Sequence, residues 1–358
     1  MKRRIATIYA TVCTLLLAAG FLLAFLFAWK DGVEATVKCL YGLFIGFLLS
    51  PILHELGHVS FALIAKMDYV FVKCFCFKIY IKNGKKRLGF ASPFSPDETQ
   101  ALPLQSGDMK KRAILYTVGG LVYGGVFLLL ILAGAVVASA VGKPSYVLWG
   151  ILPYAAYLFL LNVAPFEYGN GKTDALVYIG LKKEYDAEKN MLSAMEIQGL
   201  LSEGKSFAQI DRELYYNVPQ LCEDEPLFAV MLELRYRYHL ERGELTEATA
   251  CLNRLASVAE YMPETEFEKI AAEFVYINSL RGEMGEAEEN ASKCQAFLKG
   301  ETATAKRVLA AWSKANGQTE FVETLLKQAE ACLKNERIAG VQKFEKILLD
   351  RIEDGEIG

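Results

Sequence analysis

Four long runs with almost no charge are the feature that most constrains this 358-residue chain. They cover residues 5–29, 39–65, 113–142 and 144–166, and Glu55 is the only Asp, Glu, Lys or Arg within them. Each run exceeds the roughly 20 helical residues that cross about 30 Å of hydrocarbon. The first half of the chain therefore predicts four membrane-spanning helices. We expect the first run to be a retained helix, because its apolar core is too long for a signal peptide and no cleavage site of small residues follows it.

The charges divide the chain into two parts. Residues 1–165 contain 16 Lys and Arg against 7 Asp and Glu, whereas residues 166–358 contain 23 against 35. A net negative second half argues against nucleic-acid binding, since phosphate requires the opposite sign of charge. We expect a transmembrane domain over residues 1–183 and a soluble helical domain over residues 184–358.

The basic residues predict an orientation in the membrane. Residues 66–112 carry ten Lys and Arg, and the N-terminus carries three. The connections on the other side, residues 30–38 and those around Lys143, carry three between them. Because basic segments remain in the cytosol, both termini should be cytosolic. We expect a multi-pass protein of a bacterial cell membrane.

The second run contains the sequence His54-Glu55-Leu56-Gly57-His58. On a helix, His54 and His58 lie one turn apart on the same face, and two imidazoles at that separation can hold one zinc ion. Glu55 lies beside them, where it can take a proton from water. Such a motif also arises by chance in soluble helices, but an ionisable group inside an apolar run usually marks function. The motif therefore predicts a Zn²⁺ site with His54 and His58 as ligands and Glu55 as the base.

A catalytic zinc needs a third protein ligand. A polar, glycine-broken stretch follows the fourth run, and a helix is expected to restart at Asp174. Broken backbone at membrane depth is tolerated where it is buried in protein or lines a wet cavity. Asp174 is thus either the third ligand or an ordinary helix N-cap, and Glu167 is the competing ligand.

These motifs together resemble the site-2 protease family of intramembrane zinc metalloproteases. The resemblance covers roughly residues 35–180 and rests on His54-Glu55-x-x-His58, Asn162-x-x-Pro165 and the later Asp174. It implies that His54, His58 and Asp174 bind zinc, that Glu55 activates water and that Asn162 helps to shape the substrate-facing surface. The family's commonest spacing would place the aspartate at Asn170, and Ala175 replaces the glycine that usually follows the aspartate.

The resemblance implies a zinc metalloendopeptidase that hydrolyses peptide bonds in or near transmembrane segments of membrane proteins or peptides. A helical substrate must unwind first, because its carbonyls are hydrogen-bonded. Residues 69–80 are rich in β-forming residues and predict a strand that pairs with the unwound substrate by edge addition. Within this strand, Phe75 and Phe77 are expected to contact the substrate. The alternative is an ordinary hairpin that seals the cytosolic mouth of the site.

The second half alternates amphipathic helical stretches with glycine turns. Gly204, Gly243, Gly282 and Gly317 recur at intervals of 39, 39 and 35 residues. Helix–turn–helix repeats of about this length stack into solenoids, and these resemble degenerate tetratricopeptide repeats. They predict regulation of the membrane domain or docking of a protein partner. The alternative is a plain helical bundle with no partner.

The resulting prediction is a mainly α fold. It consists of a polytopic membrane helix bundle with about four spans and a short β-hairpin, followed by a cytosolic α-helical repeat domain. Gly42-x-x-x-Gly46 and Gly120-x-x-x-Gly124 predict close helix–helix contacts in the bundle. Two other functions compete with the protease. One is a catalytically inert, membrane-anchored scaffold that acts through its repeats, and the other is a transporter, which four spans without duplicated halves disfavour.

Overall fold

The structure is a computed structural model that describes residues 2–82, 84–92, 95, 97–168, 171–259 and 264–355. It is 73% helical and contains a small sheet. The chain forms two compact units, which we call the first unit (Met1–Leu102 with Asp108–Glu188) and the second unit (Pro103–Gly107 with Lys189–Gly358). The main boundary between the units follows Glu188, five residues beyond the predicted boundary after residue 183. The short segment Pro103–Gly107 belongs to the second unit.

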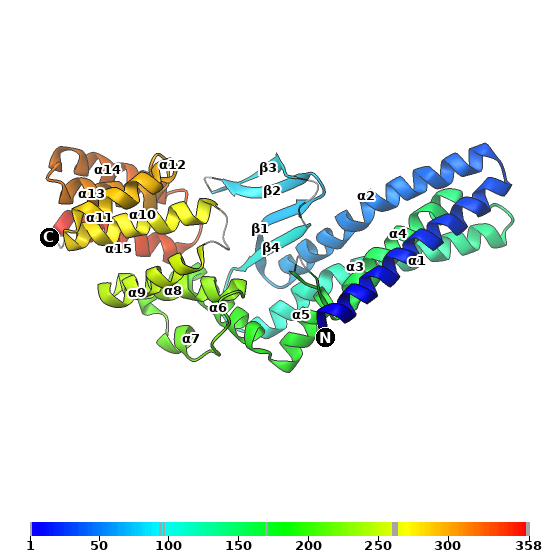
Figure 1. The fold of residues 1–358 in the computed structure, drawn as a ribbon, viewed down its shortest axis with the longest axis horizontal. Coiled ribbons are helices and arrows are strands. Elements are labelled where there is room, and N and C mark those ends of the chain that lie inside the picture. The colour runs from blue at the N-terminus through cyan, green and yellow to red at the C-terminus, as the bar shows by residue number, and fades with distance from the viewer. Residues whose placement is uncertain are drawn as a thin grey trace. The chain divides into compact units, whose positions relative to one another are not determined.

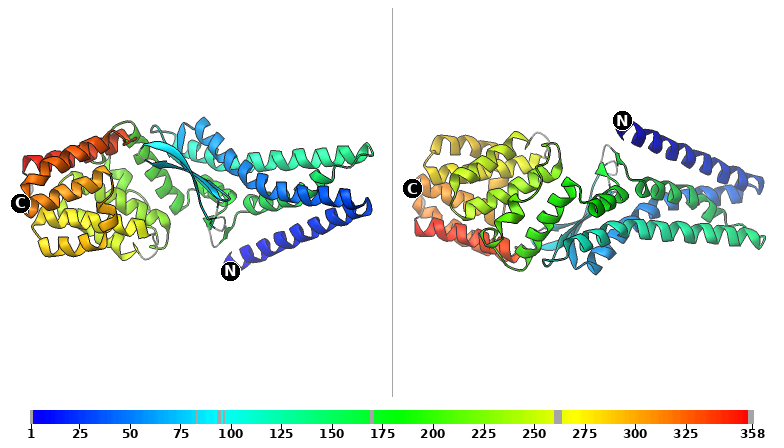
Figure 2. Two further views of the ribbon diagram at one scale, coloured as in Figure 1. Left: turned by 90° about the horizontal axis from the view of Figure 1, so that it is seen from above. Right: turned by 90° about the horizontal axis from the view of Figure 1, so that it is seen from below.

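Four helices of the first unit are long and apolar enough to cross a membrane (Figures 1 and 2). They are α1 (Lys2–Lys30), α2 (Val33–Ile64), α3 (Met109–Ala140) and α4 (Tyr146–Val163). The 32 residues of α2 and of α3 extend for about 48 Å at 1.5 Å per residue. Both helices are therefore longer than the hydrocarbon core. The prediction of a mainly helical chain with four membrane-crossing helices agrees with this finding.

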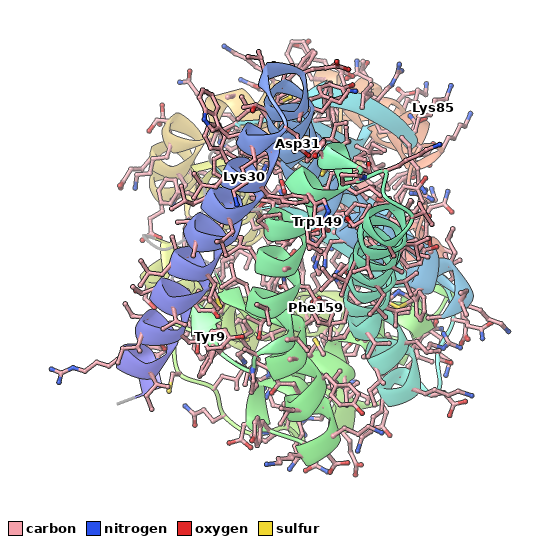
Figure 3. All side chains as sticks on the ribbon, turned by 90° about the vertical axis from the view of Figure 1, so that its right-hand side faces the viewer. Tyr9, Lys30, Asp31, Lys85, Trp149 and Phe159 are labelled. Carbon is pink, nitrogen blue, oxygen red and sulfur yellow. The ribbon has the colours of Figure 1, made fainter. Side chains whose placement is uncertain are left out.

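Helix α4 contacts both α1 and α3 (Figure 3). The ring of Trp149 lies 6.0 Å from the ring of Phe27 on α1, and its indole N–H donates to Ser139 Oγ on α3 at 3.1 Å. Phe159, further along α4, lies against Gly125 on α3. Because α2 also packs against both α3 and α4, the helix that carries the His54–His58 motif has neighbours on two sides.

Two glycines allow α2 to approach α4 closely. A Cβ atom added to Gly42 would lie 2.1 Å from the carbonyl oxygen of Val147, and one added to Gly46 would lie 2.9 Å from that of Ile151. Atoms cannot approach so closely without a shift of the backbone. The contact predicted from Gly42-x-x-x-Gly46 is therefore present.

The second glycine pattern acts differently from the prediction. The close approach of α3 to α2 occurs at Gly119, where an added Cβ atom would lie 2.5 Å from the carbonyl oxygen of Gly57. An added Cβ atom on Gly120 would instead meet the imidazole rings of His54 and His58. Gly120 therefore provides room for side chains of α2, and the close backbone approach that we predicted at Gly120-x-x-x-Gly124 lies one residue earlier, at Gly119.

A four-stranded sheet connects α2 to α3 (Figure 1). Its strands are β1 (Met67–Cys74), β2 (Phe77–Lys82), β3 (Lys85–Phe90) and β4 (Glu98–Pro103). Their order in the sheet is β3-β2-β1-β4, and β1 and β2 form an antiparallel hairpin. The edge strands of the sheet are therefore β3 and β4.

The prediction of a single edge strand over residues 69–80 is wrong. Phe75 has a φ of 53° in the turn that ends β1, and β2 starts at Phe77. Both strands are interior, because β1 lies between β2 and β4 and β2 lies between β1 and β3. Their backbone groups bond within the sheet, so this segment forms the hairpin alternative and offers no edge to a substrate.

The second unit consists of helices joined by short turns. Gly204, Gly243, Gly282 and Gly317 all have positive φ, between 72° and 92°, the left-handed conformation in which glycine ends helices readily. The predicted glycine turns are therefore present. Successive helices α8–α9, α10–α11 and α13–α14 pack against each other. The helices of this unit and of the segment that leads into it are α5 (Asp174–Lys183), α6 (Asp186–Ser202), η1 (Phe207–Gln209), α7 (Arg212–Tyr216), α8 (Pro226–Glu241), α9 (Leu245–Ser257), α10 (Glu264–Arg281), α11 (Met284–Lys293), α12 (Gln295–Leu298), α13 (Ala303–Ala315), α14 (Thr319–Leu333) and α15 (Ala339–Asp354).

Candidate metal centre

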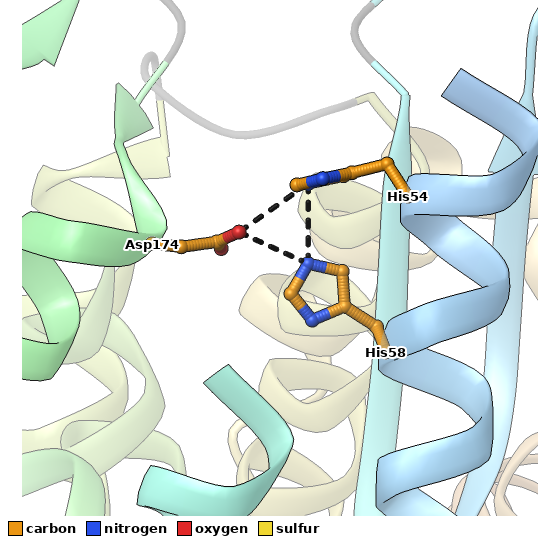
Figure 4. A group of neighbouring side chains, drawn as sticks. All are labelled: His54, His58 and Asp174. Carbon is orange, nitrogen blue, oxygen red and sulfur yellow. Dashed lines mark hydrogen bonds and ion pairs between the residues drawn. The ribbon is translucent and has the colours of Figure 1, made fainter. Parts of the chain in front are cut away.

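His54, His58 and Asp174 converge in the first unit (Figure 4). The two histidines lie one turn apart on α2, and their Nε2 atoms are 3.3 Å apart. Asp174 is the first residue of α5, and its Oδ2 lies 3.3 Å from His54 Nε2 and 3.4 Å from His58 Nε2. Among the described residues this is the only group of three His, Cys, Asp or Glu side chains arranged so that they could hold a metal ion.

The three distances fit one ion. Nitrogen and oxygen ligands bind zinc at about 2.0–2.2 Å, so two ligand atoms at neighbouring corners of a tetrahedron lie about 3.3–3.5 Å apart. The separations of 3.3, 3.3 and 3.4 Å between the three atoms match three edges of such a tetrahedron. Two imidazoles and one carboxylate also leave the fourth corner for another molecule.

Hydrogen bonding supports the same interpretation. Asp174 Oδ2 is buried and forms no hydrogen bond with any described residue. His54 and His58 are also buried. If both facing Nε2 atoms carry a lone pair, they cannot form a hydrogen bond with each other. Buried polar atoms without partners are costly. A cation between the three atoms would satisfy all of them, so the residues fit a metal ion.

The backbone of α3 completes the surroundings of the histidines. His58 Nδ1 lies 3.0 Å from the carbonyl oxygen of Tyr116. Donation to this carbonyl selects the tautomer whose Nε2 lone pair points to the site, as is usual for metal-bound histidines. Gly120 is one turn further along α3, and a Cβ atom there would lie 2.5 Å from His58 Nε2. Only glycine leaves room for the two rings at this position.

Asp174 is positioned by the residue before it. Thr173 is the N-cap of α5, since its Oγ1 accepts from the N–H of Leu176 at 3.3 Å. The same hydroxyl donates to the carbonyl of Ala164 at 2.7 Å, so it ties the start of α5 to the end of α4. Asp174 is therefore not the N-cap that we considered, and its carboxylate is available to the histidines.

The competing ligand Glu167 does not join the cluster. It lies in β5 (Glu167–Tyr168), which pairs with β6 (Gly171–Lys172), and it is exposed. Lys172 forms an ion pair with the buried Glu188 at 3.3 Å, which anchors the ribbon two residues before Asp174. The structure therefore places Asp174, and not Glu167, beside the two histidines.

Glu55 is buried next to the ligands and is held by a residue that we did not predict. Thr99 of β4 donates its hydroxyl to Glu55 Oε2 at 2.6 Å, and both side chains are buried. The phenol of Tyr116 donates in turn to the carbonyl of Thr99. No local motif marks Thr99 or Tyr116, because the contacts join residues 44 and 17 positions apart.

The predicted substrate-contacting residues are dispersed. The amide of Asn162 donates to the carbonyl of Leu158 in its own helix at 3.1 Å. Phe75 lies in the turn after β1, and its ring is 5.8 Å from that of Phe47 on α2. Phe77 is 51% exposed. None of the three belongs to the group of ligand atoms.

Cys74 ends β1 close to the site. Burial, with smaller contributions from Asp97 and Glu55, raises the pKa of its thiol to about 12. Cys74 does not belong to the group of facing ligand atoms, which consists of two nitrogens and one oxygen.

Comparison of the chain with models of protein families, with curated proteins and with solved structures found no match.

Proposed function

We propose that this protein is an intramembrane zinc metalloprotease of the site-2 protease type. The observation that carries the proposal is the cluster of His54, His58 and Asp174 beside a buried Glu55 on a helix apolar enough to cross a membrane. Its substrates would be membrane proteins or peptides cleaved in or near a transmembrane segment. The resemblance of the motifs to that family supports the same conclusion.

His54, His58 and Asp174 would hold the zinc ion through the three facing atoms. When bound, zinc supplies Lewis acidity that polarises the scissile carbonyl and makes a neighbouring water more acidic. The histidines contribute no charge when neutral, and Asp174 contributes one negative charge. The ion and its three ligands would therefore retain about one positive charge, which favours the developing oxyanion once Glu55 has taken the proton and become neutral.

Glu55 would act as the general base and acid. Its Oε2 is occupied by Thr99, so Oε1 remains to take a proton from the attacking water and to return it to the leaving nitrogen. Both side chains are buried. Surrounding protein would limit competing reactions with bulk water.

The position of the motif along α2 supports cleavage within the membrane. Helix α2 ends at Ile64, six residues after His58 and ten residues after His54. These intervals correspond to about 9 and 15 Å along the helix axis. If α2 leaves the hydrocarbon near its end, the ligands lie below the membrane surface and are reached from the side of the sheet.

An extended substrate segment would pair with the edge strand β4. This strand carries Thr99, which contacts Glu55. A substrate strand added at this edge would have its peptide bonds close to the base. In this proposal the unwound substrate therefore pairs with β4, and not with residues 69–80 of the same sheet.

From the basic connections we infer that both termini lie in the cytosol, and we propose that the membrane is that of a bacterial cell. The second unit would then be a cytosolic domain of degenerate tetratricopeptide-like repeats, since its successive helix pairs pack against each other and turn at regularly spaced glycines. Such a domain would bind a regulatory protein partner.

Glu55→Gln tests the proposal. The amide keeps the shape of the side chain but cannot act as a base, so turnover should fall by about 100- to 10,000-fold. Membrane peptides released from cells that carry the wild-type protein or Glu55→Gln should be compared by mass spectrometry. Metal content should be the same in both proteins.

The scaffold alternative makes the opposite prediction. If wild-type and Glu55→Gln cells release the same membrane peptides, and if the purified protein binds no zinc, the protein acts through its helical second unit. Bound zinc with no difference in released peptides would separate metal binding from proteolysis.

A further inference from the structure

Thr99 and Glu55 form a contact between two elements that are distant in the sequence. The hydroxyl of Thr99 on β4 lies 2.6 Å from Glu55 Oε2 on α2. Thr99 is 9% exposed and Glu55 is 6% exposed. A hydrogen bond from a buried hydroxyl to a carboxylate is short and strong, because little water competes for the acceptor.

The alternation of β4 explains why Thr99 reaches the site. Glu98 and Gln100 are exposed, whereas Thr99 between them is buried. Successive side chains of a strand point to opposite faces. The strand therefore directs one hydroxyl toward Glu55 and its two neighbours away from it.

Tyr116 connects this contact to the metal ligands. Its phenol donates to the carbonyl of Thr99, and its own carbonyl faces His58 Nδ1 at 3.0 Å. One residue of α3 thus bonds to the strand that holds the base and to a histidine of the ligand cluster. The base and the ligand are fixed relative to each other through Tyr116 and Thr99.

We propose that Thr99 is a positioning residue that fixes Oε2 of Glu55 and thereby leaves Oε1 as the oxygen that exchanges the proton. This inference rests on the proposed function. Without the hydroxyl, the Glu55 side chain can rotate about its terminal bonds, and the carboxylate spends less time in the reactive orientation. The role requires a hydrogen-bond donor at position 99 and not merely a side chain of the right size.

Two substitutions at the same position test this requirement. Thr99→Val keeps the shape and removes the donor, and Thr99→Ser keeps the donor. With a designed single-span peptide as the substrate in lipid nanodiscs, kcat of Thr99→Val should fall by about 10- to 100-fold. KM and zinc content should be unchanged, and Thr99→Ser should stay within about threefold of the wild type.

Thr36→Val is the matched control. Thr36 is a buried threonine on the same helix as Glu55, and its hydroxyl donates to the carbonyl of Gly32 at 3.0 Å. This variant also loses one hydroxyl that donates a hydrogen bond, but far from the site. Its kcat should equal that of the wild type. Equal kcat in Thr99→Val and wild type would overturn the inference, as would an equal loss in Thr99→Ser and Thr99→Val.

A measurement without turnover separates this inference from the proposed function. Isotope-edited infrared spectroscopy identifies the Glu55 carboxylate as the band lost in Glu55→Gln. This band should shift in Thr99→Val and not in Thr99→Ser or Thr36→Val. A shift with no cleavage by the wild type would contradict the protease and retain the contact. An unshifted band would overturn the role of Thr99 even if the protein is a protease.

Tyr116→Phe provides a second route if Thr99→Val does not fold. It removes only the phenol that holds the carbonyl of Thr99, and the backbone contact to His58 remains. The Glu55 band should shift less than in Thr99→Val, and kcat should fall by about three- to tenfold. An unchanged band and an unchanged kcat in Tyr116→Phe would overturn the inference.

Discussion

Each unit of the protein contains a buried cluster of ionisable side chains, and the two clusters differ in how many of their polar atoms have hydrogen-bond partners. In the second unit, Arg307 is fully buried and donates to Glu345 at 2.8 Å and to Glu273 at 2.7 Å. Tyr236 donates to the same Glu273 at 2.6 Å, and the guanidinium lies 4.1 Å from the ring of Tyr276. Of the guanidinium nitrogens, only Nη1 forms no hydrogen bond with a described residue.

The cluster of the first unit contains no Lys or Arg side chain. The Nε2 atoms of His54 and His58 face each other at 3.3 Å, and Asp174 Oδ2, which forms no hydrogen bond, lies 3.3 and 3.4 Å from them. This difference helps to distinguish buried polar clusters that have a structural role from those that bind an ion. A buried cluster that includes its own cation needs no further ion, whereas neutral histidines facing a carboxylate leave lone pairs that a metal cation would satisfy.

Replacing Asp174 should have the largest effect. Asp174→Ala removes one of three ligands, so zinc affinity should fall by about 1,000-fold or more, and turnover should be lost with it. Competition with a zinc-binding dye measures the affinity. Glu167→Ala is the matched control, because this exposed acid lies outside the cluster, and it should stay within about twofold. An equal loss in both variants would contradict the assignment of the third ligand.

Breaking the Arg307 cluster should affect stability and not metal binding. Arg307→Met leaves Glu273 and Glu345 without their cation, which should destabilise the second unit by about 3–5 kcal/mol. Thermal unfolding, with limited proteolysis as the readout, measures this change in stability. The zinc content should be unchanged. Lys327→Met, at an ion pair in which both side chains are more than 70% exposed, should leave the unfolding temperature unchanged, because solvent screens the pair. An Arg307→Met protein as stable as the wild type would show that the network contributes nothing.

Substitution by alanine should affect zinc binding at Gly120 but not at Gly124, although both glycines lie on α3. A Cβ atom at Gly120 would lie 2.5 Å from His58 Nε2, whereas one at Gly124 has its nearest neighbour 3.8 Å away. Gly120→Ala should therefore displace a ligand and weaken zinc binding by about 10- to 100-fold, while Gly124→Ala should leave it unchanged. Isothermal titration with zinc measures both, and equal affinities would contradict the position of the rings.

The smallest effect should come from equivalent N-caps in the two units. Thr173 caps α5, and Thr302 caps α13 by accepting from the N–H of Ala305 at 3.2 Å. Thr173→Val and Thr302→Val should each cost about 1 kcal/mol. Only Thr173→Val should also weaken zinc binding, by a few-fold, because Asp174 follows it. Weakened binding in Thr302→Val would show that general destabilisation explains the effect.

The helices were predicted well because hydrophobicity is a local property. The run at residues 39–65 corresponds to α2, which starts earlier, at Val33. The additional first turns contain Glu34 and Lys38, which form an ion pair at 2.6 Å. Hydropathy identifies the part of a helix that suits hydrocarbon, whereas hydrogen bonding continues the helix into charged residues.

The sheet and the surroundings of the site could not be predicted in the same way. The β-forming residues of 69–80 indicate strands, but strand order depends on pairing with Glu98–Pro103, a polar segment that follows much later. Thr99 becomes important only through that pairing. The choice between Asp174 and Glu167 depends on Thr173, whose hydroxyl bonds to Ala164 and so fixes where α5 begins.

The metal content of the purified protein tests the central claim most directly. The wild-type protein, prepared without added metal and exchanged against a weak chelator, should contain about one zinc ion per chain by mass spectrometry. The double variant His54→Ala and His58→Ala should contain less than about one tenth of that amount. A wild-type protein that takes up no zinc, or a double variant that retains it, would contradict the account.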